Sequence, residues 1–366
     1  MKFTGVKTEK VSELKRQLVV PDIKAGESEA LMKLETRLAQ YTGADHCVLT
    51  KSGTYGLLAA LKASGVREGD GVMCTSFSFL ATSEIITLAG ASPVYVDTNP
   101  NTYNVDPYCL EYVLKKCARR KLNMPKALVA ANLFGMPCDF DALGEVCLRY
   151  NVALIEDMSC SFGASYKGKK SGNFGRFSVA SFFPAKPLGD GGDGGGVFCR
   201  TREDVKILTS LLEVKKDHPF HFTGVNLIGE KLTIYTENLS RRQLVAARYR
   251  DNLRDFVKLQ QAGADYISAY TQFAIELNDE NQRDFVIDAL RDKQIPCSVV
   301  CRSNRARPAE NEWENVVLTN AGKAENRLIT IPIHPYLSVR VVDYISECIM
   351  EASEVSKLDA HVKAEK

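Results

Sequence analysis

Residues 46–76 read HCVLTKSGTYGLLAALKASGVREGDGVMCTS, and this stretch decides the fold class. HCVLT (46–50) is a short apolar run typical of a strand, YGLLAALKASG (55–65) has the spacing of a helix, and GVMCTS (71–76) is a second strand pattern. The same alternation continues along the chain as far as Asp157. Strands that alternate with helices predict a mainly parallel sheet covered by helices, and therefore an α/β fold.

The second half of the chain shows a change of pattern that predicts a domain boundary. Residues 217–230 (DHPFHFTGVNLIGE) look irregular, a long helix follows over 231–258, and the remainder indicates a smaller α/β unit with an irregular stretch at 302–326. The length of 366 residues, at about 150 residues per domain, also suggests two domains. We therefore expect a large domain with an N-terminal arm over residues 1–225, and a linking helix with a small domain over 226–366.

Composition and charge argue against several classes of function. Lys and Arg number 47 and Asp and Glu 45, so the formal net charge of +2 disfavours a dedicated nucleic-acid or membrane-surface binder. No apolar run reaches the length of a membrane span, and the N-terminus lacks the apolar core of a secretory signal. The 11 cysteines are typical of small buried thiols in a reducing cytoplasm, where we expect the protein to reside. His218 and His221 have no further ligands nearby, so we predict no metal site.

Lys186 stands in the segment SFFPAKPLGDGGDGGG (181–196), among apolar and glycine residues. A lysine that is partly removed from water can attack a carbonyl group as the neutral amine, and the glycines let the backbone pass close to a bound group. The simpler interpretation is a lysine in an exposed turn, and the segment alone leaves both open. The glycine string also looks like a dinucleotide-binding loop, but it precedes a strand pattern rather than a helix, which excludes that interpretation.

Three further features fit a ligand site at the carboxyl edge of the predicted sheet. Asp157 ends the strand pattern NVALIED, where α/β sheets place their ligands, although a helix cap would explain it equally well. Ser52, Gly53 and Thr54 lie between a strand and a helix, where free N–H groups suit a phosphate or serve as an ordinary N-cap. Phe79 is either a core residue or a group that stacks on a flat ring. Together with Lys186, this set suits pyridoxal phosphate, which needs an anchored phosphate, a lysine and a carboxylate at its ring nitrogen.

The motifs resemble those of the DegT/DnrJ/StrS sugar aminotransferases, which are fold-type I pyridoxal phosphate enzymes. Within that family the nearest resemblance is to the UDP-N-acetyl-3-oxo-glucosaminuronate 3-aminotransferases. The resemblance implies a mainly parallel seven-stranded sheet sandwiched by helices, plus a smaller C-terminal α/β domain. It rests on SGT (52–54), SFSFLAT (76–82), PVYVDTNPNTYNVDP (93–107), LFGMPCDFDAL (133–143), IEDMSCSFGASYKGKKSG (155–172) and SFFPAKPLGDGGDGGG (181–196).

The resemblance also implies a role for each matching residue. Lys186 matches the Schiff-base lysine, Asp157 the partner of the ring nitrogen and Phe79 the residue that stacks on the ring. Asn226 matches an asparagine that reaches the phosphate of the neighbouring subunit's cofactor, which implies a homodimer. The phosphate contacts of the family match Gly53, Thr54 and Ser181.

The chain departs from the family pattern at several places. Cys160 occupies a cofactor-binding position where the family has a glutamine that hydrogen-bonds the ring hydroxyl. The segment after Asn226 is shorter and lacks the usual arginine, and SVVCRSNRARP (298–308) replaces a segment that carries a substrate-facing histidine. The resemblance implies transfer of an amino group, from a donor such as L-glutamate, to a nucleotide-linked keto sugar. Two alternatives stay open: a catalytically impaired homologue that serves as a binding or assembly subunit, and a sugar dehydratase, against which Lys186 counts because such relatives carry histidine there.

Overall fold

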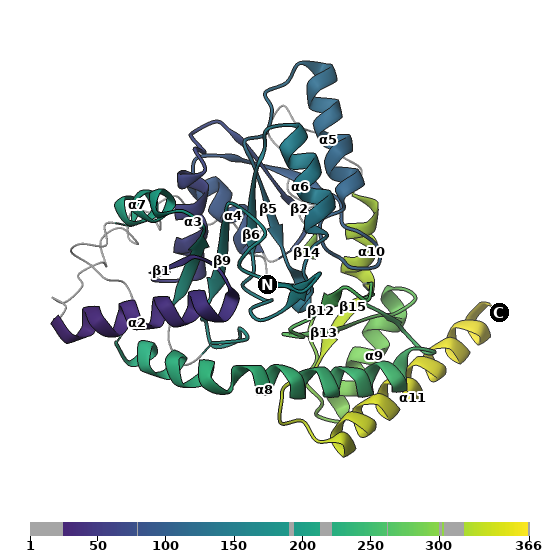
Figure 1. Cartoon of the computed structure of the whole chain (residues 1–366). Coiled ribbons are helices and arrows are strands. Elements are labelled where there is room, and N and C mark those ends of the chain that lie inside the picture. The colour runs from purple at the N-terminus through teal and green to yellow at the C-terminus, as the bar shows by residue number, and fades with distance from the viewer. Residues whose placement is uncertain are drawn as a thin grey trace, which may run out of the picture.

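The computed structural model describes residues 25–78, 80–189, 194–212, 222–261, 263–299, 302–303 and 318–364. A central sheet with helices on both faces occupies one part of the molecule, and a smaller sheet lies beside it. The long helix α8 (Phe222–Leu253) runs along both, from α2 (Ala25–Thr42) at one end to α11 (Val339–Ala364) at the other (Figure 1).

The central sheet has seven strands in the order β1-β10-β9-β6-β5-β2-β4. β9, β6, β5, β2 and β4 run parallel, whereas β10 is antiparallel to both of its neighbours. This arrangement confirms the mainly parallel sheet and the α/β class that the sequence predicts. The strands are β1 (His46–Thr50), β2 (Gly71–Thr75), β4 (Ser92–Val96), β5 (Ala127–Ala131), β6 (Ala153–Asp157), β9 (Phe177–Ser181) and β10 (Gly195–Cys199).

Helices cover both faces of this sheet because its strands carry apolar side chains on both sides. Successive residues of a strand point to opposite faces, so Val72 and Cys74 pack in one core and Met73 packs in the other. The first face is covered by α3 (Gly53–Ala63), α4 (Leu80–Leu88) and α7 (Arg202–Leu211). The second face is covered by α2 (Ala25–Thr42), α5 (Pro107–Arg120), α6 (Phe140–Arg149) and the first half of α8.

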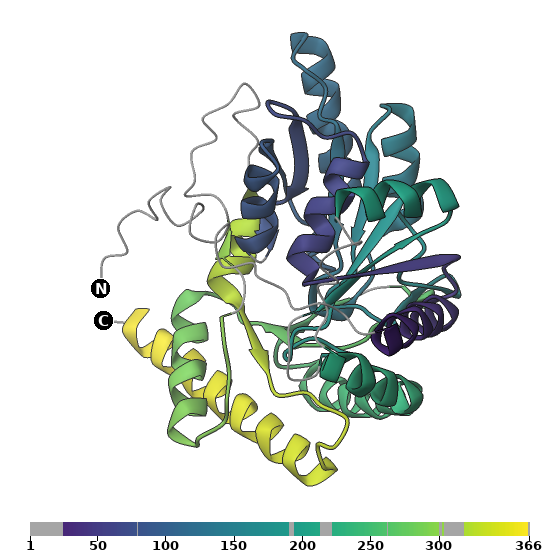
Figure 2. The same cartoon turned by 90° about the vertical axis from the view of Figure 1, so that its left-hand side faces the viewer.

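A separate apolar core surrounds a three-stranded antiparallel sheet. Helices α9 (Glu280–Asp292) and α11 and the second half of α8 supply most of its other side chains, and Figure 2 shows α9 and α11 packed side by side. The elements of this core are β11 (Lys258–Leu259), β13 (Phe273–Glu276), β15 (Leu328–Ile331), α9 (Glu280–Asp292) and α11 (Val339–Ala364).

Two short ladders connect segments that are distant along the chain. β12 (Tyr266–Ile267) pairs with β7 (Ser165–Tyr166), which also pairs with β8 (Lys169–Lys170). β14 (Arg302–Ser303) pairs with β3 (Phe77–Ser78). Both ladders join a segment that follows α8 to a segment that precedes it. They therefore connect the part of the chain that contains the smaller sheet to segments that follow strands of the central sheet.

Helix α8 begins earlier than the sequence predicts. The stretch 217–230 was expected to be irregular, yet α8 starts at Phe222, and it ends at Leu253 rather than at residue 258. Contact with α2 compensates for the low helix propensity of glycine in its first turns. Arg37 of α2 donates a hydrogen bond to the carbonyl of Gly229 at 2.6 Å, and a Cβ on Gly229 would lie only 2.9 Å from Arg37 Nη1.

Helix α10 (Thr319–Arg327) occupies the end of the stretch 302–326 that was predicted to be irregular, and that prediction is wrong for residues 319–326. Backbone N–H groups in its first turn donate hydrogen bonds to a side chain that is distant along the chain. The carboxylate of Asp97 accepts hydrogen bonds from the backbone N–H groups of Asn320 at 3.0 Å and Ala321 at 2.9 Å. A cap that comes from a residue so far away along the chain leaves no local signal in the sequence.

Candidate active site

A cavity of about 180 Å³ lies at the carboxyl edge of the central sheet. It opens where β5, β6 and β9 end and where the chain leaves β1 for α3, which is where parallel α/β sheets bind their ligands. The rest of its wall comes from α3, α4 and the end of β3. Six of the eight predicted site residues line this one cavity: Gly53, Thr54, Asp157, Cys160, Ser181 and Lys186.

The start of α3 forms one end of the cavity and suits an anion. The Ser52 side chain caps the helix by accepting a hydrogen bond from the N–H of Tyr55 at 3.2 Å, while the other N–H groups of a first turn have no helical acceptor. Gly53 approaches the end of β9 so closely that an added Cβ would lie 2.8 Å from the Cβ of Ser181. Backbone N–H groups and a serine hydroxyl therefore converge without a side chain between them.

Asp157 and Lys186 stand on the same cavity although they are 29 residues apart in the numbering. Asp157 ends β6, is half-buried, and accepts a hydrogen bond on Oδ1 from the N–H of Ser159 at 3.0 Å. Lys186 is also half-buried, and its Nζ donates a hydrogen bond to Cys160 Sγ at 3.2 Å. Burial raises the pKa of the Cys160 thiol, and the nearby Lys186 amine opposes that rise.

A buried hydrogen-bond network fixes the strand ends behind the cavity. Glu156, next to Asp157 on β6, is fully buried and accepts hydrogen bonds from Ser178 Oγ at 2.7 Å, the N–H of Gly172 at 2.9 Å and Asn132 Nδ2 at 3.0 Å. Burial raises the pKa of this carboxyl, whereas the hydrogen bonds lower it. Because Glu156 joins residues of β9 and of the segment after β5, it holds neighbouring strand ends in register.

Asn132 also lines the cavity, and it is a candidate site residue that the sequence patterns did not single out. Its amide Nδ2 donates to Ser161 Oγ at 2.8 Å, and its Oδ1 accepts from the N–H of Cys138 at 2.9 Å. A signal was available, because Asn132 is the first polar residue after the apolar strand pattern KALVAA and so stands at the carboxyl end of a strand, as Asp157 does.

The remaining predicted residues do not lie on this cavity or are not placed. Phe79, His218 and His221 lie outside the described residues. Asn226 is exposed on the first turns of α8 and is not among the residues that line the cavity. Within the described segments, no helix is long and apolar enough to cross a membrane, and no group of three or more His, Cys, Asp or Glu side chains is placed to hold a metal ion.

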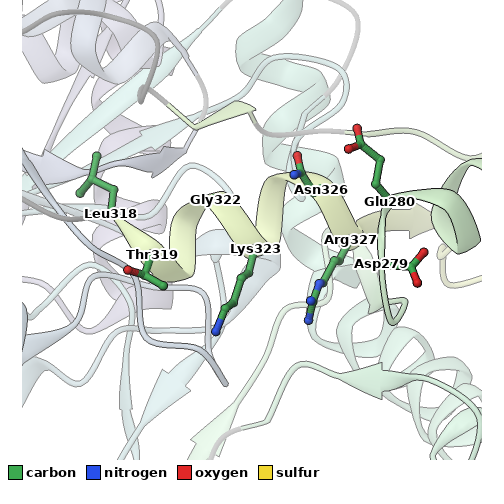
Figure 3. A pocket seen from close by; sticks show the side chains of 8 residues that line it. All are labelled: Asp279, Glu280, Leu318, Thr319, Gly322, Lys323, Asn326 and Arg327. Atoms are coloured by element: carbon green, nitrogen blue, oxygen red, sulfur yellow. The ribbon is translucent and has the colours of Figure 1, made fainter.

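A larger hollow of about 540 Å³ lies between α10 and the start of α9, and it contains none of the predicted site residues (Figure 3). Lys323 and Arg327 point to the same side of α10 there, and Asp279 and Glu280 lie at the start of α9 (Figure 3). Cationic and acidic side chains are thus balanced, and apart from the half-buried Arg327 these four are exposed. The smaller cavity combines an amine, a carboxylate and a turn that suits an anion, and it is the better candidate for chemistry.

Comparison with known proteins decides the family. The family model described as "DegT/DnrJ/EryC1/StrS aminotransferase family" matches residues 9–350. The chain belongs to this family. The resemblance inferred from its motifs is therefore confirmed, and so is its assignment to the aminotransferases.

Individual relatives support the same assignment along most of the chain. The UDP-2-acetamido-2-deoxy-3-oxo-D-glucuronate aminotransferase of Pseudomonas aeruginosa is 34% identical over 325 residues, which cover 86% of this chain and 88% of the relative. The UDP-N-acetyl-3-dehydro-alpha-D-glucosamine 3-aminotransferase of Acidithiobacillus ferrooxidans is 30% identical over 279 residues, 73% of each chain. A solved structure of a DegT DnrJ EryC1 StrS aminotransferase from Brucella abortus superposes with a TM-score of 0.82 at 29% identity, covering 93% of this chain and 92% of that one.

Proposed function

We propose that this protein is a pyridoxal phosphate-dependent aminotransferase that transfers an amino group, with L-glutamate as donor, to a UDP-linked 3-keto sugar. The observation that carries the proposal is the placement of Lys186, Asp157 and the Gly53–Thr54 turn around one cavity. The nucleotide and the position of the ketone are supported by two relatives whose names specify UDP-linked 3-oxo or 3-dehydro sugars.

The cavity fits the cofactor in the arrangement of its donor groups. Gly53, Thr54 and Ser181 would hold the phosphate, since the missing Cβ of Gly53 leaves room for the close approach of α3 to β9. Asp157 would face the ring nitrogen, and Lys186 would hold the aldehyde carbon. When bound, pyridoxal phosphate supplies an electron-accepting ring that stabilises negative charge on the carbon bearing the transferred amino group.

The protein's own groups supply charge and proton transfer around that ring. The Asp157 carboxylate, oriented by the N–H of Ser159, favours a proton on a nitrogen next to it. Lys186, which lines the cavity, would take the proton from the carbon that bears the amino group and would return a proton on the product side. The apolar wall formed by Leu57, Ile85 and Leu133 limits access of water to these groups.

We further propose a homodimer in which Asn226 contacts the cofactor phosphate of the partner subunit. Support comes from the position of Asn226, which is exposed on α8 and therefore free to meet another surface rather than its own cavity. We also propose that the chain divides into domains at residues 225 and 226, since separate apolar cores surround the central sheet and the three-stranded sheet. Because α8 begins at Phe222, this division falls inside the helix that connects the two cores.

The decisive experiment is a covalent trap of the lysine. The purified protein is mixed with pyridoxal phosphate and reduced with borohydride, and the adduct is located by peptide mass. We expect it on Lys186, and we expect Lys186→Ala to abolish it, while Lys170→Ala, which removes another half-buried lysine that does not line the cavity, leaves it unchanged. Adduct formation that is undiminished in Lys186→Ala would rule out the assignment.

A second candidate is a homologue that binds the cofactor but does not turn over. Cys160 favours it, because a thiol is a weaker hydrogen-bonding group than an amide and this thiol lines the cavity. The half-reaction separates the two candidates. Conversion of the bound cofactor to its amine form on addition of L-glutamate supports the aminotransferase, and UDP-linked keto sugars are then tested as acceptors. An unconverted cofactor on Lys186 supports the binding subunit.

A further inference from the structure

The thiol of Cys160 is fixed in position by its surroundings. Its side chain is 6% exposed, and the N–H of Ser161 donates to the carbonyl of Met158 at 2.9 Å, which closes the turn that carries it. The Cys160 carbonyl accepts a hydrogen bond from Thr271 Oγ1, so the turn is also attached to the segment that leads into β13. A cysteine side chain has a single rotatable bond to its sulfur, and with this backbone held from two sides Sγ has little freedom.

The amine of Lys186, by contrast, stands at the end of a flexible side chain. Two backbone hydrogen bonds hold the turns on either side of it. The N–H of Lys186 donates to the Phe183 carbonyl at 2.8 Å, and the N–H of Gly189 donates to the Lys186 carbonyl at 2.9 Å. Beyond the backbone, a lysine side chain has four rotatable bonds and loses considerable entropy when it is ordered. The hydrogen bond from Nζ to Cys160 Sγ at 3.2 Å brings this flexible amine to a fixed point on the cavity wall.

We propose that Cys160 is a positioning residue of the site, whose thiol holds the Lys186 amine at the cavity in the cofactor-free protein and so prepares it to react with the aldehyde. This inference rests on the function proposed above. In that reaction the Lys186 nitrogen forms a bond to the aldehyde carbon, and the aldehyde oxygen leaves as water. Ordering the amine beforehand removes part of the entropic cost of reaching the reactive geometry.

The chemistry of sulfur makes a thiol suitable for this task. A thiol sulfur is a weak acceptor, so it orients the amine without stabilising the ammonium form as strongly as a carboxylate would. The raised pKa of the Cys160 thiol, caused mainly by burial, is consistent with an uncharged partner. The titratable groups on the described cavity wall are Asp157, Cys160 and Lys186, so a change at position 160 is expected to alter the protonation of the amine directly.

The test measures how fast the cofactor-free protein forms its adduct with pyridoxal phosphate as a function of pH. We expect Cys160→Ala to slow adduct formation about three- to tenfold, since the amine must then be ordered during the reaction. Cys160→Ser, which keeps an acceptor in place, stays within about twofold of the wild type. Cys160→Asp moves the pH midpoint upward by about one unit or more, because a carboxylate favours the ammonium form. Cys147→Ala, which removes a buried thiol of α6, is the matched control and leaves both rate and midpoint unchanged.

A second measurement probes the contact without the cofactor. o-Phthalaldehyde joins a neighbouring thiol and amine in a fluorescent isoindole, with loss of two water molecules, and we expect it to link Cys160 to Lys186 in the wild type and not in Cys160→Ser. Absence of that link in the wild type, or alanine and aspartate variants with the wild-type rate and midpoint, would overturn the inference. Failure of the proposed function has a different signature, since it is the absence of any cofactor adduct on Lys186 in the wild type.

Discussion

Glu35 of α2 makes stability depend on pH in a direction that a single substitution can test. Its side chain is half-buried, and Oε1 accepts a hydrogen bond from the N–H of Leu49 on β1 at 2.9 Å. Burial raises the pKa of this carboxyl from 4.5 to about 7, with the hydrogen bond opposing the rise. The folded protein therefore binds a proton here in a range where the unfolded chain has already released it.

The direction and the size of the effect on the free energy of unfolding follow from the pKa of Glu35 in the unfolded chain and in the folded protein. Below about pH 4.5 both states are protonated and the group contributes nothing. Between about 4.5 and 7 the folded state holds more protons than the unfolded state, so the free energy of unfolding falls as pH rises. Above pH 7 the full destabilisation is present. At about 1.4 kcal/mol for each unit of pKa, a difference of 7 − 4.5 = 2.5 gives about 3.5 kcal/mol.

Glu35→Gln keeps an oxygen for the N–H of Leu49 and removes the charge, so it is expected to stabilise the protein at about pH 8. With an unfolding entropy of about 2.1 cal/mol/K per residue over 366 residues, about 3.5 kcal/mol corresponds to a rise in Tm of about 4.5 °C. The advantage disappears toward pH 4.5. Glu29→Gln on the same helix, where the exposed Glu29 pairs with Lys33, is the control and shows no such pH dependence over this range. A Tm difference between Glu35→Gln and wild type that is constant from about pH 5 to 8 would refute the reasoning.

Two further substitutions address the cavity. Gly53→Ala places a Cβ 2.8 Å from the Cβ of Ser181, so we expect the dissociation constant for pyridoxal phosphate to rise at least about tenfold; Gly144→Ala in α6, whose Cβ meets nothing within 4 Å, leaves binding unchanged and raises stability by about 0.5–1 kcal/mol. Asp157→Asn keeps the size of the side chain but removes its charge, so the borohydride-trapped adduct on Lys186 persists while the half-reaction with L-glutamate, followed by the change in cofactor absorbance, slows about a hundredfold or more. Equal half-reaction rates in Asp157→Asn and wild type would contradict the role given to the carboxylate.

The parts of the site that could be predicted from sequence are those set by local pattern. Asp157 follows an apolar strand and the Gly53–Thr54 turn precedes a helix, and both features fix a place on the carboxyl edge of a parallel sheet before any coordinates are known. Lys186 was weak evidence alone, because its segment is compatible with an exposed turn. Lys186 became informative in combination with Asp157 and the Gly53–Thr54 turn, and the structure brings all three to one cavity.

The parts that escaped prediction depend on contacts between distant residues. The cap of α10 comes from Asp97, and the start of α8 is held by Arg37, neither of which can be read from the local sequence. The contact between Cys160 and Lys186 is of the same kind. From the sequence, Cys160 was only a departure from the family glutamine, whereas its thiol lies 3.2 Å from the lysine amine.

The segment that enters β13 links the geometry of the cavity to the folding of the second core. Gly135, in the turn η1 (Leu133–Gly135) after β5, has φ +102°, and a Cβ there would lie 2.7 Å from the N of Tyr270. One residue further on, Thr271 Oγ1 donates to the Cys160 carbonyl after β6. A single segment thus fastens two walls of the cavity, and close-packed interiors transmit displacement rather than absorb it. The position of the Cys160 thiol, and with it that of the Lys186 amine, therefore depends on β13 being folded against its own core, so the central sheet alone would not reproduce the site.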